Sequence, residues 1–140
     1  EYVISTLKEY LLEDCEAFGI QYVAFDPYNA KQLSEDLESE GLKPVKMPQT
    51  HSHFNETIAD YLLQVSEKRF RPDVNDVVLR WCSLNMCIDR NSQNLMMPSK
   101  KGSRDKIDAA VAAVLAYQAR LQALSKGEAT KTTFVPRRIR

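Results

Sequence analysis

A short apolar segment that ends in Asp-Pro is the feature that most limits the folds open to this chain. Residues 20–26 read IQYVAFD and are rich in β-branched and aromatic side chains. A run this short and this continuously apolar predicts a β-strand that is buried on both faces. Because Pro27 has no N–H with which to continue a ladder, we expect the strand to end at Asp26.

Helical patterns and a second strand surround this segment. Apolar side chains recur at helical spacing in residues 2–18. Residues 29–40 predict a second amphipathic helix, with Asn29 as its N-cap and Gly41 as its C-terminal stop. Residues 42–48 are short and bounded by prolines, which favours an edge-like strand. Helices and strands in alternation indicate an α/β fold with parallel pairing.

The rest of the chain predicts three more helices and a hairpin. Residues 53–67 form a helical pattern, and residues 77–84 predict a short helix in which Trp81 is expected to anchor the core. Residues 86–99 read MCIDR, NSQN and LMMPS, which predicts a β-hairpin around a polar turn. The Ala-rich residues 105–124 predict a long helix. The apolar face of the first of these helices is expected to contain Phe54, Ile58, Tyr61, Leu62 and Val65.

The composition is that of one globular domain. The chain has 140 residues, of which 44% are hydrophobic and 27% charged, and no apolar run approaches the ~20 residues that span a bilayer. Equal numbers of acidic and basic residues, 19 of each, argue against broad coating of nucleic acid, while the basic residues 98–106 suit local contact with phosphates. Residues 126–140 predict a flexible basic tail. Because the chain begins at Glu1 and is helix-like from the start, we expect it to be a fragment of a longer protein.

Two aspartates stand where such a fold gathers ligands. Asp26 follows the carboxyl end of a strand, where open α/β sheets bind ligands, although a turn Asp before proline is an equally good interpretation. Asp108 lies in the first turn of the last helix, with Asp105 one turn earlier, and the helix dipole alone would favour acids there. Small residues after Asp108 let this helix pack closely on the sheet, which would pair Asp108 with Asp26. Paired carboxylates suit Mg²⁺ or Mn²⁺.

Other catalytic patterns are absent or weak. The sequence has no GxxxxGK[ST] loop for nucleotide phosphates and no serine in a GxSxG context. His51 and His53 have no partner at zinc-like spacing, so we expect them to be exposed or at a helix start. The odd cysteine count without CxxC favours reduced core thiols over a disulfide or zinc site. These cysteines are Cys15, Cys82 and Cys87.

Four segments, taken in order, resemble the C-terminal half of the large terminase subunits of tailed bacteriophages and prophages. The first is similar to the family's strand, Asp-Pro-Tyr-Asn-Ala and helix, and the second to a short strand that leads into Gln and a polar turn. The third is similar to its Trp helix, Asn-led hairpin and Lys, and the fourth to its Ile-Asp-Gly helix start. They are YVAFDPYNAKQLSEDLESEG (22–41), VKMPQT (45–50), NDVVLRWCSLNMCIDRNSQNLMMPSKK (75–101) and KIDAAVAAVLA (106–116).

The resemblance implies an RNase H-like nuclease domain of the retroviral-integrase superfamily over residues 1–125. Its α/β sheet, flanked by helices, would lack its first strands and carry an added β-hairpin. Such domains hold two divalent ions, Mg²⁺ or Mn²⁺, in a cluster of carboxylates and hydrolyse the phosphodiester bonds of double-stranded DNA. In the whole terminase, the nuclease cuts concatemeric DNA during genome packaging in the host bacterial cytoplasm, together with the small subunit and the portal or procapsid. No membrane partner is implied.

The resemblance also assigns roles to particular residues. Asp26 matches the family's acid at the end of its central strand, and Asp108 matches its acid at the start of the last helix. Asp105 is a weaker candidate metal ligand. The family has a Lys before that helix, in the basic stretch suited to phosphate oxygens. The candidate DNA phosphate contacts are Lys100, Lys101 and Arg104.

Three departures leave alternatives open. The family's first catalytic Asp belongs to a strand that would precede residue 1. Residues 71–76 read RPDVND where the family often has His-Gly-Asn-Pro, and Ala109 replaces the usual Gly after Ile-Asp. The chain is therefore either the nuclease domain or a non-catalytic terminase fragment that binds DNA or packaging partners. Another RNase H-like nuclease or resolvase would share the metal chemistry.

Overall fold

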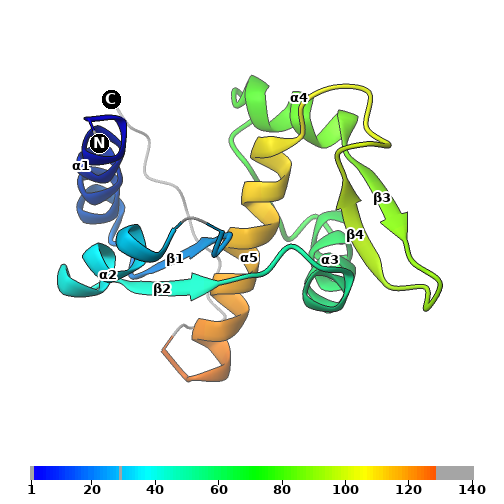
Figure 1. Cartoon of the computed structure of the whole chain (residues 1–140). Helices are drawn as coiled ribbons and strands as arrows, with labels where there is room; N and C mark the ends of the chain where they lie inside the picture. Colours follow the sequence, from blue (N-terminus) through cyan, green and yellow to red (C-terminus); the bar gives the residue numbers. More distant parts are fainter. Residues whose placement is uncertain (1, 29, 129–140) are drawn as a thin grey trace.

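The structure of the chain is a computed structural model that describes residues 2–28 and 30–128. Figure 1 shows α5 crossing the middle of the molecule, with α1, α2, β1 and β2 on one side and α3, α4, β3 and β4 on the other. The helices are α1 (Tyr2–Phe18), α2 (Lys31–Ser39), α3 (His51–Ser66), α4 (Val77–Asn85) and α5 (Asp108–Ser125). The strands are β1 (Tyr22–Phe25), β2 (Lys43–Lys46), β3 (Cys87–Arg90) and β4 (Met96–Ser99).

Strands β1 and β2 pair in parallel through the α2 crossover, which confirms the predicted α/β arrangement. Their register runs from Tyr22 opposite Lys43 to Phe25 opposite Lys46. Gly41 follows α2 with φ of 80°, a left-handed conformation that suits the position after a helix. The prediction that β1 is buried on both faces is wrong, because all four of its residues are half-buried. Within the described residues, β1 has a strand neighbour on one edge only.

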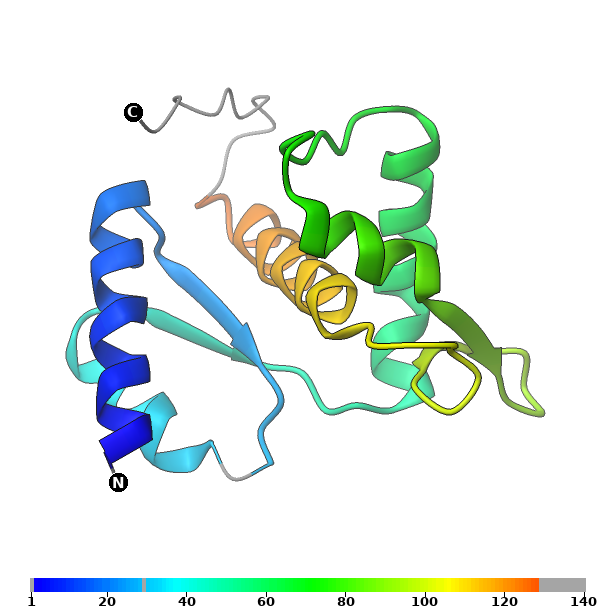
Figure 2. The ribbon, with the colours of Figure 1, turned by 90° about the horizontal axis from the view of Figure 1, so that it is seen from above.

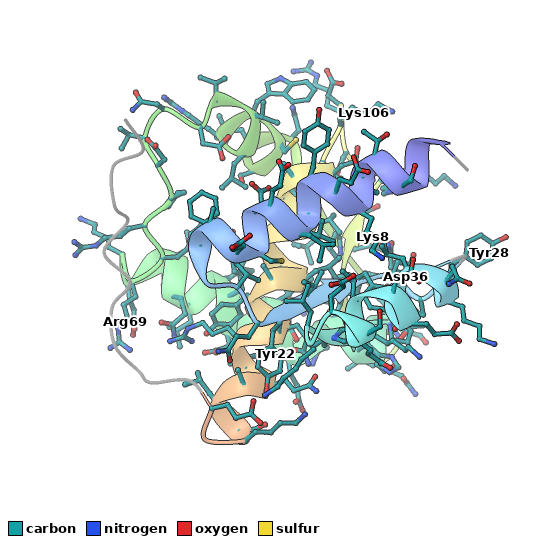
Figure 3. The ribbon with its side chains drawn as sticks, turned by 90° about the vertical axis from the view of Figure 1, so that its left-hand side faces the viewer. Lys8, Tyr22, Tyr28, Asp36, Arg69 and Lys106 are labelled. Atoms are coloured by element: carbon teal, nitrogen blue, oxygen red, sulfur yellow. The ribbon has the colours of Figure 1, made fainter. Side chains whose placement is uncertain are left out.

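The two helices on this side of the molecule are joined by ion pairs. Figure 3 shows Lys8 of α1 and Asp36 of α2 close together, and their charged atoms are 3.8 Å apart. Lys8 also lies 3.7 Å from Glu40, the residue that follows α2. The predicted N-cap of α2, Asn29, lies outside the described residues. Ala30 occupies the N-cap position, and its side chain has no oxygen with which to cap the helix.

The core lies between α3 and α5. Phe54, Ile58 and Tyr61 of α3 are buried against Val114 and Tyr117 of α5. The aromatic rings of Tyr61 and Tyr117 meet edge to face with centroids 5.8 Å apart. Helix α3 begins at residue 51, two residues before the predicted start. The predicted apolar face was too wide, because Leu62 and Val65 are exposed.

Two hydrogen bonds reinforce the contact between α3 and α5. The Tyr117 hydroxyl donates to Asp60 Oδ2 at 2.5 Å, and the Thr57 hydroxyl donates to the side chain of Gln118. Burial, together with the hydrogen bond and negative charge of Asp60, raises the pKa of Tyr117 to about 12. These polar contacts fix α5, the helix that begins at Asp108, in one position along α3.

Helix α4 presents Trp81 outward. Asp76 caps the helix by accepting the Leu79 N–H at 2.9 Å, and Cys82 is buried. Trp81 is 44% exposed, so its predicted role as a core anchor is wrong. Because each helical residue turns by about 100°, Trp81 lies on the opposite side of α4 from the half-buried Leu79. The side of α4 that carries Leu79 and Cys82 therefore faces the core, and the side that carries Trp81 faces solvent.

The hairpin forms as predicted and packs on α3. Strands β3 and β4 are antiparallel, and the Asn91 carboxamide accepts the N–H of Leu95 to close the turn. On the α3 side, Asn55 Oδ1 accepts the Met96 N–H at 3.0 Å, and His51 Nε2 lies 3.3 Å from Asp89 Oδ2. The hairpin thus projects from the α3 side of the molecule (Figure 1).

The three cysteines are unpaired thiols: Cys15 and Cys82 are buried, whereas Cys87 is exposed. Most of the predicted basic tail, residues 129–140, lies outside the described residues. No helix in the described part of the chain combines the length and apolar character needed to cross a bilayer.

Candidate functional site

Asp108 is the first residue of α5. Ile107 precedes it, is almost fully buried and holds the start of the helix in the core. The helix begins three residues later than predicted, so Asp105 lies in the preceding loop rather than one helical turn before Asp108. There Asp105 Oδ1 accepts the Lys106 N–H at 2.9 Å. Asp108 therefore lies at the positive end of the α5 dipole.

A pocket of about 310 Å³ opens in front of this carboxylate. It brings together three of the residues singled out from the sequence: Lys100, Asp105 and Asp108. Lys101 and Arg104 are exposed on the same loop but do not line the pocket. The complete lining consists of Lys100, Ser103, Asp105, Lys106, Ile107 and Asp108.

Lys100 forms an ion pair with Asp108. Its Nζ lies 3.4 Å from Asp108 Oδ1, and the two side chains are 66% and 68% exposed. Ion pairs this open to solvent contribute at most about 1 kcal/mol. Lys100 and Asp108 are eight residues apart and are joined by a loop, so neither helical nor strand periodicity predicts their contact.

The loop that carries Lys100 is closed by hydrogen bonds between its two ends. Ser99 Oγ accepts the Gly102 N–H at 2.9 Å, and the Ser103 hydroxyl donates to the Ser99 carbonyl oxygen at 2.5 Å. Ser103 Oγ also accepts the Cys87 N–H at 3.1 Å, which fixes the loop to β3. A Cβ at Gly102 would lie 3.0 Å from Ser99 Oγ, so the turn leaves little room for a larger residue. This geometry directs Lys100 toward the start of α5.

Asp26 follows β1 and initiates a turn. Its Oδ1 accepts the Tyr28 N–H at 3.1 Å, and the residue as a whole is half-buried. Asp26 thus takes part in a turn through Oδ1, and its Oδ2 forms no hydrogen bond among the described residues, so its candidate role as a metal ligand stays a prediction. Tyr28 points away from the ribbon at the edge of the molecule (Figure 3). Asp26 does not line the pocket of Asp108.

The packing of β1 on α5 determines how the strand that leads to Asp26 lies relative to the helix that begins at Asp108. The Tyr22 hydroxyl, at the start of β1, donates to Glu128 just beyond the end of α5 at 2.5 Å. Lys126 Nζ lies 6.0 Å from the centroid of the Tyr22 ring. The two elements run in roughly opposite directions (Figure 2), so the carboxyl end of β1 points toward the half of α5 that begins with Asp108. The predicted close packing of α5 on the sheet is confirmed.

Lys43 of β2 strengthens the same contact. Its ammonium group pairs with Glu128, and this hydrogen bond, together with that from Tyr22, lowers the pKa of the Glu128 carboxyl. The C-terminal end of α5 is thereby held to both β1 and β2. Figure 3 shows Tyr22 near this end of the helix.

The two carboxylates of the pocket, those of Asp105 and Asp108, are of the kind that a hard divalent cation binds. They supply too few ligands to complete the coordination of such a cation. Mg²⁺ is commonly bound through one or two carboxylates, with water and substrate phosphates filling the remaining positions. Asp108 is exposed at an open pocket, and Asp105 is its acidic neighbour there. Across residues 2–28 and 30–128, no three His, Cys, Asp or Glu side chains come together as a ligand group.

The histidines lie away from these aspartates. His51 is the first residue of α3 and pairs with Asp89 of the hairpin. His53 is exposed, and its Nδ1 lies 2.7 Å from the Thr50 hydroxyl oxygen. Both positions agree with the prediction of an exposed or helix-start role.

This chain is similar to a protein family, to an Escherichia coli protein and to a solved structure. The family model described as "Terminase large subunit, endonuclease domain" matches residues 9–123. Protein YmfN of Escherichia coli (strain K12) is 28% identical over 113 residues, which cover 76% of this chain and 25% of YmfN. The crystal structure of the HK97 bacteriophage large terminase superposes with a TM-score of 0.73 at 20% identity, over 83% of this chain and 24% of that one. The chain thus spans about a quarter of the length of YmfN and of the HK97 terminase. At 20% identity, the likeness to the HK97 terminase supports the fold alone.

Proposed function

Because this chain belongs to the family of terminase large-subunit endonuclease domains, we propose that it is the metal-dependent DNA-cutting part of a larger packaging protein. The observation that carries the proposal is the position of Asp108. It stands at the mouth of an open pocket, at the positive end of a helix that packs on β1, the strand that leads to Asp26. Acids at the end of a strand and at the start of the last helix are the arrangement that an RNase H-like nuclease requires.

Asp26 and Asp108 are the residues proposed to hold the cations, with Asp105 in a supporting position. Two Mg²⁺ or Mn²⁺ ions in the complete site would supply an activated water and stabilise charge on the leaving oxygen of a phosphodiester. The carboxylates bind and orient, and the exposed basic loop before α5 offsets the charge of the DNA backbone. That loop provides Lys100, Lys101 and Arg104.

A further acid is needed to complete this centre. By the resemblance to terminases, we propose that this acid lies on a strand before the segment described here. Among the described residues, one edge of β1 has no strand neighbour, and such a strand would add there. An added strand would pair with the backbone N–H and C=O groups along that edge of β1. In the whole protein, the same site would cut concatemeric double-stranded DNA, with the small subunit and the portal or procapsid as partners in the host cytoplasm.

A non-catalytic role is the second candidate. The observation that favours it is the absence of a group of three metal-ligating side chains in the described part of the chain. Such a fragment would bind DNA or packaging partners without cutting. A different RNase H-like nuclease or resolvase would use the same metal chemistry, but the match to the terminase family over residues 9–123 argues against it.

Nicking of supercoiled plasmid in Mn²⁺ tests the proposal. We expect Asp26→Asn and Asp108→Asn each to lower the nicking rate by roughly 100-fold or more, since a metal site contributes several kcal/mol of transition-state stabilisation. Asp14→Asn, an exposed acid on α1, is the matched control and should leave the rate unchanged.

The outcomes separate the candidate functions. Full activity in both the Asp26 and Asp108 variants would refute the assignment of these residues. A wild-type chain that does not nick, and that gains activity when the upstream part of the polypeptide is restored, would show that the missing acid lies there. A restored protein that binds DNA but still does not cut in Mn²⁺ would favour the non-catalytic role.

A further inference from the structure

We propose that Lys100 is a displaceable counter-ion that couples cation binding at Asp108 to contact with DNA. This inference rests on the proposed function, because it takes Asp108 to be a cation ligand. Its starting point is the ion pair between Lys100 Nζ and Asp108 Oδ1 at 3.4 Å. Without a cation, the lysine neutralises the carboxylate on which the cation would bind.

The pair is suited to exchange. About two thirds of each side chain is open to solvent, so little desolvation opposes its opening. A lysine ammonium sits on a flexible four-carbon stem and can turn to a new partner without moving the backbone. The backbone itself is held by the hydrogen bonds among Ser99, Gly102 and Ser103. The movement is therefore confined to one side chain.

A cation and Lys100 compete for Asp108. Mg²⁺ binds a carboxylate oxygen at about 2.0–2.1 Å, which would set two positive charges only a few ångströms from the ammonium group. This repulsion favours the state in which Lys100 turns away, and a DNA phosphate is a partner of the right charge at the mouth of this open pocket.

Both ligands therefore favour the same state of the lysine. When DNA draws Lys100 away, the Asp108 carboxylate is left free for a cation; when a cation displaces Lys100, the lysine is free for a phosphate. By linkage, each ligand raises the affinity for the other by the same factor. Because the exposed pair contributes at most about 1 kcal/mol, that factor is expected to be about two- to five-fold.

The neighbouring basic residues do not share this position. Lys101 and Arg104 lie on the same loop without lining the pocket. Lys106, labelled in Figure 3, lines the pocket but forms no ion pair with a carboxylate in the part of the chain that the structure describes. Lys106→Gln is therefore a matched control, since it removes one positive charge from the same pocket and leaves the Asp108 pair in place.

The test measures free Mn²⁺ by electron paramagnetic resonance during titration of the 140-residue chain. Each titration is run with and without a 20-base-pair duplex, a protein-free duplex provides the blank, and a gel verifies that the DNA stays intact. We expect the duplex to raise the Mn²⁺ affinity of the wild type about two- to five-fold. Lys100→Gln should raise that affinity by a similar factor without DNA and remove most of the duplex effect, whereas Lys106→Gln should keep the duplex effect.

The results that would overturn the coupling are specific. An unchanged Mn²⁺ affinity in Lys100→Gln would overturn it. Equal changes of Mn²⁺ affinity in Lys100→Gln and Lys106→Gln would also overturn it, as would the absence of Mn²⁺ binding in both the wild type and Lys100→Gln. Asp108→Asn separates this failure from that of the proposed function. If Asp108→Asn binds Mn²⁺ like the wild type, the ligand assignment itself is wrong. If Asp108→Asn loses binding while Lys100→Gln has no effect, only the role of Lys100 is refuted.

Discussion

Helix α5 is held to α3 by a hydrogen bond from the Tyr117 hydroxyl to Asp60 Oδ2, and Tyr117→Phe removes that bond while keeping the ring. The bond is 2.5 Å long, its acceptor is charged, and Tyr117 is only 7% exposed. Hydrogen bonds to charged groups contribute about 1.5–3 kcal/mol. We therefore expect Tyr117→Phe to lower the free energy of unfolding by about 1.5–3 kcal/mol at pH 8.

The same bond makes this loss depend on pH. Burial and the neighbouring Asp60 raise the pKa of Tyr117 from 10.0 in the unfolded chain to about 12 in the folded one. A raised pKa contributes stability that is fully present below pH 10 and is lost as the pH rises from 10 toward 12, because the unfolded chain gives up its proton first. At pH 11, one unit above the unfolded pKa, the wild type has lost about 1.4 kcal/mol of this contribution. The difference between wild type and Tyr117→Phe should shrink by that amount.

Urea unfolding followed by circular dichroism at pH 8 and pH 11 measures both quantities. Tyr61→Phe is the matched control, since Tyr61 is buried in the same cluster, its pKa is also raised by burial, and no hydrogen bond from its hydroxyl is found among the described residues. Its loss at pH 8 should stay within about 0.5 kcal/mol. A Tyr117→Phe loss below about 0.5 kcal/mol at pH 8, or one that is the same at pH 11, would refute the reasoning.

Two further stability predictions follow from burial and capping. Ile58→Ala should lower the free energy of unfolding by about 2–5 kcal/mol in urea titration, because Ile58 is fully buried between α3 and α5. Leu63 is exposed, so Leu63→Ala should change the free energy of unfolding by less than about 0.5 kcal/mol. Similar losses at both positions would contradict the core assigned to these helices. Asp76→Ala should lower the free energy of unfolding by about 0.5–2 kcal/mol, because it removes the side chain that accepts the Leu79 N–H. Asp76→Asn should recover most of that loss, because its carboxamide oxygen can accept the same N–H. If Asn does not recover the loss, the charge of Asp76 matters more than its capping hydrogen bond.

Much of the fold is encoded in local signals that the sequence displays directly. Gly41 permits the left-handed turn after α2, and the Asn91 side chain closes the hairpin by accepting backbone N–H groups. The parallel pairing of β1 and β2 follows from two short strands joined by one helix, since parallel strands need such a crossover. Each of these features depends on residues close together in the chain, so pattern and turn chemistry suffice to predict it.

The errors arise where the outcome depends on distant residues. Helix α4 has apolar side chains on both of its sides, with Trp81 on one and Leu79 on the other, and periodicity does not show which side meets α5. The predicted burial of β1 was too high, because a continuous apolar run is typical of a strand in the interior of a sheet. Among the described residues, β1 has a strand neighbour on one edge only and its residues are half-buried. The pairing of Lys100 with Asp108 depends on a loop whose closure by Ser99 and Ser103 leaves no trace in the apolar pattern.

Helix α5 separates the parts of the molecule that determine stability from those that carry the proposed chemistry. Its middle contributes buried residues such as Val114 and Tyr117 to the core, and the segment just beyond its end is held to β1 and β2 through Glu128. Its first residue, Asp108, is exposed and makes only a weak ion pair. Changes at Asp108 are therefore expected to alter binding of cations and DNA with little effect on folding, whereas changes at Tyr117 act first on the position of the helix. A loss of activity in an Asp108 variant can thus be attributed to the carboxylate itself when the free energy of unfolding is unchanged.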